Sequence, residues 1–178
     1  MHPIKHFITI TKHKLMVMNY CFSVGLYSQG LLHDLSKYSP AEFIIGAKYY
    51  QGTRSPNNAE REFTGVSTSW LHHKGRNKHH FEHWVDYQPG AKNVIAGVKM
   101  PRRYVAEMLI DRISASRNYE GEAYTDQSPL KYFLAGKDAI WFIHPDTSRE
   151  LEGLLRMLAK WGERKTLAFV KYRYLKMP

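Results

Sequence analysis

His33 and Asp34 are adjacent in the sequence, and they are the residues of this chain best suited to chemistry. An imidazole and a carboxylate side by side form a pair of metal ligands, and the carboxylate can bridge two cations. Other candidate ligands flank the pair, with His13 before it and Asp111 after it. We therefore expect a metal site that several segments assemble.

A second cluster places five histidines within twelve residues. They are His72, His73, His79, His80 and His83. Aromatic residues are interleaved with them, and we expect Trp70 and Trp84 to anchor this segment to a core. A solvated basic loop is the alternative interpretation.

Helical spacing relative to the aromatic anchors makes His73 and His80 the preferred inward pair of this cluster. His72 and His79 are the alternates. We expect His83 to support the site by hydrogen bonds that orient the ligands.

Asp111 lies in a segment that reads as an amphipathic helix opening at Met100-Pro101. A carboxylate on the apolar face of a helix is costly to bury unless a cation or several hydrogen bonds satisfy it. A metal would do so. His13 is a weaker indication, because an imidazole among apolar residues is more often a hydrogen-bonded core histidine.

The mixture of imidazole and carboxylate ligands suits one or two divalent transition ions (Mn, Fe, Co, Ni or Zn) better than calcium. The single cysteine, Cys21, excludes a zinc finger and an internal disulfide. With no apolar h-region at the N-terminus and no apolar run long enough to span a bilayer, we expect a reducing, cytoplasmic compartment and no membrane.

Composition favours an anionic partner. The 178 residues are 43% hydrophobic, which is enough for the core of one domain over 1–178, and 26 basic against 16 acidic residues give a formal charge of +10. Nucleotides, nucleic acids and phosphorylated small molecules are the partners that such a charge favours.

Helical patterns dominate and predict an all-α fold. Helices are expected over 4–20 and 21–32, from 40 to about 51, from 56 to the first histidine pair, over 77–87, from 101, from 128, and over 146–177 with a break near Gly162. A loop is expected at 88–90 and in the stretch that follows, and residues 167–172 could be helix or strand. We expect the metal-site core at about 10–120. The helices over about 128–177 should be basic, with seven basic and two acidic residues from 151 onward.

These residues resemble the HD-domain superfamily of metal-dependent phosphohydrolases. Its pattern is a histidine on one helix, an adjacent His-Asp pair on the next, and a distant aspartate. The chain is also similar to a group of small uncharacterised bacterial and phage HD-like proteins that share HDLSKxSPxEF, WLHHKxRNKHHxEHW and MPxxYxxEMxxD, over roughly residues 10–120.

The resemblance implies an HD-like helical bundle with His13, His33, Asp34 and Asp111 as metal ligands. In members with two metals, histidines between the His-Asp pair and the last aspartate complete the second site, and this implies His73 and His80. The interval between the two histidine pairs is shorter than is usual in the superfamily, so His72 and His79 stay open as ligands.

The implied reaction is hydrolysis of a phosphate ester, with a nucleotide as the expected substrate. Metals bridged by Asp34 would activate a water and polarise a phosphoryl oxygen. Lys37 would contact the phosphate, as the lysine of the superfamily's His-Asp-x-x-Lys run does. Lys74, Arg76 and Lys78 are further candidate phosphate contacts, with plain surface solvation as the alternative for all four residues.

Two rival functions remain open. The HD arrangement with extra histidines also resembles a di-iron oxygenase that cleaves inositol. A basic nucleic-acid-binding protein with a structural metal is the other rival, in which the C-terminal helices would contact phosphates.

Overall fold

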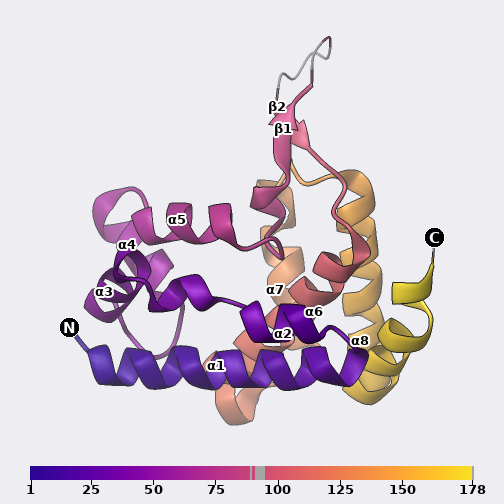
Figure 1. The fold of residues 1–178 in the computed structure, drawn as a ribbon, viewed down its shortest axis with the longest axis horizontal. Helices are drawn as coiled ribbons and strands as arrows, with labels where there is room; N and C mark the ends of the chain where they lie inside the picture. Colours follow the sequence, from indigo (N-terminus) through magenta and orange to yellow (C-terminus); the bar gives the residue numbers. More distant parts are fainter. Residues whose placement is uncertain (89, 91–94, 178) are drawn as a thin grey trace.

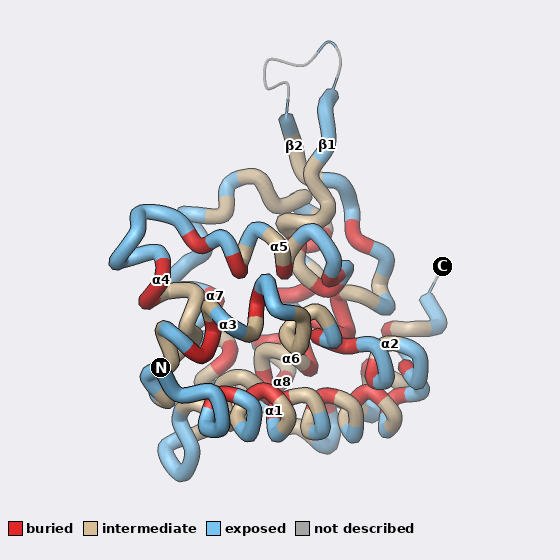
Figure 2. The backbone as a smooth tube through the Cα atoms, turned by 60° about the vertical axis from the view of Figure 1, so that its left-hand side comes forward, coloured by how far each residue is buried: buried red, intermediate tan, exposed pale blue. Residues whose placement is uncertain are grey.

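Helix α6 (Arg102–Glu120) is the element around which the other long helices pack. Its residues Val105, Leu109 and Ile113 have no exposed surface, which agrees with the apolar stripe that the sequence predicts. Helices α1 (Pro3–Val24), α7 (Ser128–Gly136) and α8 (Pro145–Tyr172) surround it (Figure 1). Buried positions therefore collect along α6 and the inner sides of its neighbours (Figure 2).

The remaining elements are shorter. They are α2 (Tyr27–Leu32), α3 (Pro40–Lys48), α4 (Pro56–Thr64), α5 (Thr68–Arg76), the 3-10 turns η1 (Leu35–Tyr38), η2 (Phe81–His83), η3 (Gly121–Ala123), η4 (Lys137–Ala139) and η5 (Tyr174–Lys176), and the strands β1 (Val85–Tyr87) and β2 (Ile95–Gly97). Helices α3, α4 and α5 gather at the end of the molecule where α1 begins (Figure 1).

The computed structural model describes residues 1–88, 90 and 95–177, and over these ranges the chain is a mostly all-α single domain, as predicted. The expected starts of α6 and α7 are confirmed, and residues 167–172 are helical. The expected break within α8 is present, because Gly162 has φ 79° and ψ 170°. In the described part of the chain, no helix combines the length and apolarity that a membrane span requires.

The first helix boundary was predicted wrongly. Helix α1 continues through residues 21–24 and ends at Gly25, which has a left-handed φ of 89°. In this conformation the backbone N–H at the helix end donates hydrogen bonds to the carbonyl oxygens of Cys21 and Phe22. Apolar periodicity continues across position 20, and the glycine at 25 is the signal that stops the helix.

The expected single helix from residue 56 to the first histidine pair is two helices. Gly65 ends α4 with φ 81°, and Ser67 caps α5 by accepting a hydrogen bond from the Trp70 amide at 3.1 Å. Glu60 of α4 accepts hydrogen bonds from the Thr68 amide at 2.9 Å and the Ser67 hydroxyl at 2.6 Å. These contacts fix α5, and with it the first histidine pair, against α4.

The segment 77–87 is not the predicted short helix. Asn77 is extended, η2 makes a single 3-10 turn, and β1 pairs antiparallel with β2 in the register Val85 to Gly97. A strand of three residues is too short for the alternation of apolar and polar residues to be recognised in the sequence. Residues 88 and 90 lie outside helices and strands, as predicted, but residues 89 and 91–94, where the loop was also predicted, lie outside the described residues, and 95–97 form β2.

Helices α1 and α3 approach closely at Gly46. The ring of His6 lies against this glycine, so that a Cβ at position 46 would collide with its Nε2 atom. Phe43 and Tyr50 hold the same ring, with centroid distances of 5.3 and 6.0 Å. Since α3 leads directly from η1, this contact helps to position the candidate site.

Replacing Gly46 with alanine should therefore destabilise the fold by about 1–3 kcal/mol, the usual cost of overpacking. Gly153, inside α8, has open space around its added Cβ, and Gly153→Ala should stabilise by about 0.5–1 kcal/mol through helix propensity. Urea unfolding of both variants checks the contrast. Equal effects of the two substitutions would contradict the close α1–α3 packing.

Candidate metal centre

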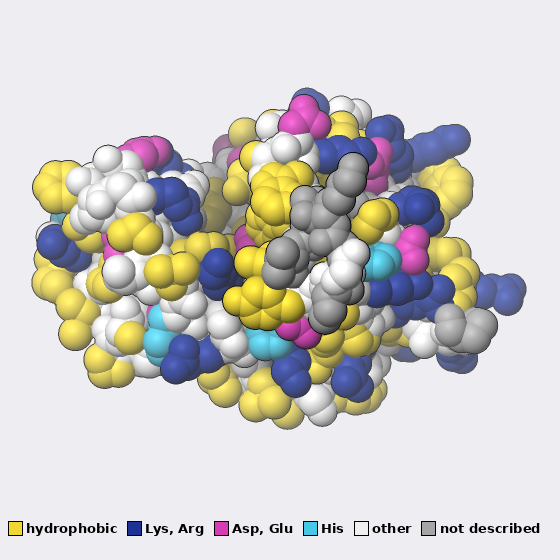
Figure 3. Space-filling model, turned by 90° about the horizontal axis from the view of Figure 1, so that it is seen from above, with side chains coloured by type: hydrophobic (Ala, Val, Ile, Leu, Met, Phe, Trp, Pro, Cys, Tyr) yellow, Lys and Arg dark blue, Asp and Glu magenta, His cyan; other side chains and the backbone are white. Residues whose placement is uncertain are grey.

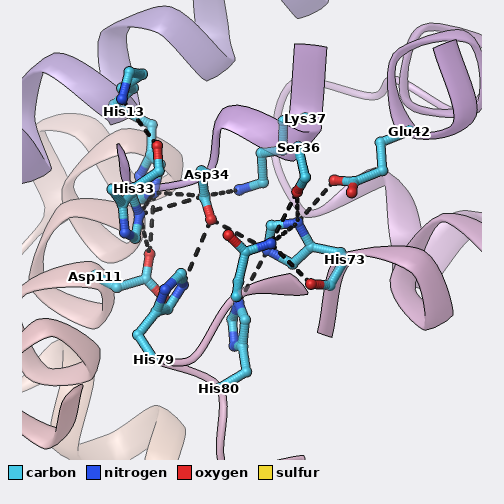
Figure 4. Close-up of polar contacts among 12 residues, drawn as sticks. His13, His33, Asp34, Ser36, Lys37, Glu42, His73, His79, His80 and Asp111 are labelled. Atoms are coloured by element: carbon cyan, nitrogen blue, oxygen red, sulfur yellow. Dashed lines mark hydrogen bonds and ion pairs between the residues drawn. The ribbon is translucent and has the colours of Figure 1, made fainter. Parts of the chain in front are cut away.

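Asp34 has the one positive φ of a non-glycine residue in the described chain, with φ 55° and ψ 22°. This left-handed conformation is uncommon for a residue with a side chain, and such conformations often mark functional sites. The preceding residue, His33, ends α2, and η1 begins immediately after Asp34. The sharp turn brings both side chains into one interior space, where Asp34 is 2% exposed (Figure 4).

The two oxygens of Asp34 face two different sets of imidazoles. Oδ2 lies 3.6 Å from Nε2 of His13 and 3.4 Å from Nε2 of His33. Oδ1 lies 3.2 Å from Nε2 of His73 and 3.5 Å from Nε2 of His79. Asp34 thus stands between two clusters of donor atoms, with one oxygen on each (Figure 4).

The first cluster consists of His13, His33, Asp34 and Asp111, whose ligand atoms all lie within 4.8 Å of one another. Asp111 Oδ1 is 3.0 Å from Nε2 of His13 and 3.6 Å from Nε2 of His33. The four residues come from α1, the end of α2, the start of η1, and α6. The structure therefore brings together all four residues that the sequence predicts for this group.

The second cluster consists of Asp34, His73, His79 and His80 within the same 4.8 Å limit. Nε2 of His73 is 3.0 Å from Nε2 of His80, and the centroids of the His79 and His80 rings are 4.1 Å apart. The second cluster therefore contains His73 and His80, the pair that the sequence favours, together with His79, one of the two alternates. The other alternate, His72, is not part of it, because its Nδ1 pairs with Glu42 at 2.6 Å.

Two buried glutamates orient these imidazoles. Oε1 of Glu107 lies 2.9 Å from Nδ1 of His33 and 3.2 Å from Nδ1 of His79, and Oε2 of Glu42 lies 2.7 Å from Nδ1 of His73. A carboxylate at Nδ1 favours the tautomer in which Nδ1 carries the donated proton, which leaves the Nε2 lone pair facing Asp34.

Sequence reasoning missed both glutamates, although each stands in a quoted motif. The signal for Glu107 was its place one helical turn before Asp111 on the buried face of α6. The supporting role predicted for His83 falls to these glutamates, because the ring of His83 packs against Trp84 with a centroid distance of 5.5 Å.

The donor set fits one or two transition metal ions. Oδ1 of Asp34 and Nε2 of His79 are buried and make no hydrogen bond within the described part of the chain. An imidazole lone pair that faces a carboxylate oxygen repels it, and a cation between the two atoms removes this repulsion. Lys37 supplies a positive charge at Oδ2 alone, with Nζ at 2.5 Å.

The pKa directions differ among the donor residues. Burial opposes ionisation of Asp34 and Asp111, but neighbouring imidazoles in their protonated form, joined at Asp34 by the Lys37 ammonium, outweigh it and hold both pKa values well below the usual range. Burial lowers the pKa of His79 and lowers that of His80 further, whereas the neighbouring carboxylates outweigh burial and raise the pKa values of His33 and His73. Binding of a metal ion by His33 or His73 therefore displaces a proton. Ionised carboxylates and neutral imidazoles are the forms that bind metals.

The four predicted phosphate contacts do not lie together. Lys37 is at the cluster, whereas Arg76 and Lys78 line a separate cavity that His33 and His79 also border. Lys74 is partly buried and does not line that cavity. Of the four, Lys37 alone contacts a residue of the two clusters.

A family model, described as a family of unknown function (DUF5662), matches residues 2–157. No curated protein and no solved structure matches the chain. The matched range includes every residue of the two clusters.

Metal analysis of the protein after reconstitution and desalting should find about two equivalents of a divalent transition ion. The His13→Gln and His80→Gln proteins should each bind about one equivalent of metal less than the wild type. The Asp34→Asn protein should lose both equivalents, because the two clusters share the Asp34 carboxylate. The exposed His2, replaced in His2→Gln, is the matched control. Undiminished metal in a folded Asp34→Asn protein would contradict the assignment.

The glutamates should separate the two clusters. Glu42→Gln should weaken binding at the second cluster by about 10–100-fold, the usual effect of losing a group that orients a ligand. Glu107→Gln should weaken both, because Glu107 contacts His33 and His79. Competition with a chromophoric chelator measures these affinities, and equal effects of the two substitutions would argue against this division.

Proposed function

This chain belongs to DUF5662, a family of unknown function, and we propose that it is a metal-dependent phosphohydrolase of the HD type. The observation that best supports the proposal is the position of Asp34 between two sets of buried imidazoles. A carboxylate with one oxygen on each set suits a bridge between two cations, which is the arrangement that hydrolysis of a phosphate ester uses.

Within such a site each residue has a separate task. His13, His33 and Asp111 would hold one ion, His73, His79 and His80 the other, and Asp34 would bridge them. When bound, the ions supply a water of lowered pKa and polarise the phosphoryl oxygen. Glu42 and Glu107 keep the imidazole rings in the orientation that binding needs.

Lys37 is the residue that we expect to contact the substrate. Its side chain is 29% exposed while its Nζ lies 2.5 Å from Asp34, so it reaches from the surface into the cluster. Coulombic attraction to Asp34 outweighs burial and raises its pKa, which keeps it charged. In the proposed complex, the Lys37 ammonium group donates a hydrogen bond to a phosphate oxygen of the substrate.

An anionic substrate agrees with the charge of the molecule. The formal charge is +10, and on the face seen from above Lys and Arg side chains outnumber Asp and Glu (Figure 3). Such a field raises the local concentration of anions near the surface. A nucleotide or a related phosphorylated small molecule is the substrate class that we propose.

A di-iron oxygenase of the HD type is the second candidate, because the same donor set of histidines and carboxylates suits iron. Iron content and oxygen consumption in the presence of substrate distinguish the two functions. Consumption of oxygen without release of phosphate would favour the oxygenase over the hydrolase.

Hydrolysis of bis(p-nitrophenyl) phosphate and of a nucleotide panel tests the proposal. Asp34→Asn should abolish metal-dependent hydrolysis while circular dichroism shows an unchanged helical content. Lys37→Ala should retain metal but lower kcat/KM by about 10²-fold, as loss of one charged phosphate contact does. Lys12→Ala, which removes an exposed lysine of α1, is the control. Hydrolysis that survives Asp34→Asn would overturn the proposal.

A further inference from the structure

A cavity of about 430 Å³ lies between α2, the end of α5 and the start of α6. His33, His79 and Glu107 form part of its wall. His33 donates from Nδ1 to Glu107, Nδ1 of His79 lies 3.2 Å from the same carboxylate oxygen, and Asp34 is not among the lining residues. The cavity therefore lies on the Glu107 side of these rings, away from the Nε2 atoms that face Asp34.

Three cationic side chains border the cavity, and each comes from a different segment. Arg76 ends α5, Lys78 follows in the connection to η2, and Arg103 is in the first turn of α6. All three are exposed, and none forms an ion pair with a described residue. The one carboxylate of the lining is Glu107, which both imidazoles already engage. The rim thus carries uncompensated positive charge.

Packing fixes this rim in place. Trp84 donates a hydrogen bond from Nε1 to the Lys78 carbonyl at 2.7 Å, and its ring packs against Tyr104 with a centroid distance of 5.6 Å. The Arg103 guanidinium lies 4.9 Å from the centroid of the same Tyr104 ring. Asn77 donates from Nδ2 to the His73 carbonyl at 2.8 Å. The cavity is therefore preformed, which is the usual condition of small-ligand sites.

We propose that this cavity binds a nucleotide at a site separate from the metal centre. The phosphate groups lie among Arg76, Lys78 and Arg103, because charge-assisted hydrogen bonds to guanidinium groups are the strong contacts for phosphate. The base contacts the exposed part of the Tyr104 ring, and Gln29 offers an amide to its polar edge, since both residues line the cavity. The volume falls within the roughly 300–1,000 Å³ of small-molecule sites.

The cavity could simply be the outer part of the substrate site. Against this, the rings of His33 and His79 stand between the cavity and Asp34, and both side chains are at most 2% exposed. A ligand seated among the three cations does not reach the Nε2 atoms. The inference rests on the cavity alone and does not require hydrolytic activity.

Isothermal titration of ADP into metal-free protein tests the inference, with the wild type in chelator and Asp34→Asn as parallel samples. Both should bind one ADP. Arg103→Ala should weaken binding by at least about tenfold, since a hydrogen bond between charged groups contributes roughly 1.5–3 kcal/mol. Tyr104→Leu should also weaken it. Arg164→Ala removes an exposed arginine of α8 that does not line the cavity, and it should leave affinity unchanged.

Several results would overturn the inference. Equal losses in Arg103→Ala and Arg164→Ala would show attraction by net charge alone. Binding that needs metal and disappears in Asp34→Asn would place the ligand at the metal centre. Pyrophosphate binding as tightly as ADP would remove the role of the base. Absence of hydrolysis, with ADP still bound to the metal-free protein, would refute the proposed function and leave this inference standing.

Discussion

The buried carboxylate of Asp34 is the constraint on which the rest of this structure depends. An ionised group that is 2% exposed is costly unless opposite charge or hydrogen bonds satisfy it. Here the surroundings are four Nε2 atoms and one lysine, all within 3.6 Å. Helices α1 and α5, with the segments that follow α2 and α5, each bring part of this surrounding.

The carboxylates of Glu42 and Glu107 orient the imidazole rings. Glu107 lies one turn before Asp111, so α6 supplies both a donor of the cluster and the group that orients two other donors. Helix α6 can do this because its remaining inner positions, such as Ile110 and Ile113, are completely buried and fix its rotation. The same packing that makes α6 the centre of the core therefore sets the geometry of the site.

Charge is distributed unevenly between the interior and the surface. Asp34, Glu42, Glu107 and Asp111 concentrate negative charge within the site, and Lys37 is the cation that contacts it. The molecule as a whole nevertheless carries a formal charge of +10. In the function that we propose, the interior donors hold cations while the basic surface attracts an anion, and metal-assisted chemistry on a phosphate requires this combination.

The sequence by itself determined the all-α fold, because helical periodicity and proline or serine start signals are local properties. It also indicated three members of the first cluster, since His33 and Asp34 are adjacent and the apolar face of the segment that follows Pro101 includes Asp111, whereas the resemblance to the HD-domain superfamily added His13. Tertiary structure decided between His72 and His79, and it revealed the roles of Glu42 and Glu107. Those outcomes depend on the break between α4 and α5 at residues 65–67 and on the extended segment that begins at Asn77 after α5. These two features set the directions in which the histidine side chains point. Packing between helices that are distant in the sequence, rather than the neighbouring residues, fixes those directions.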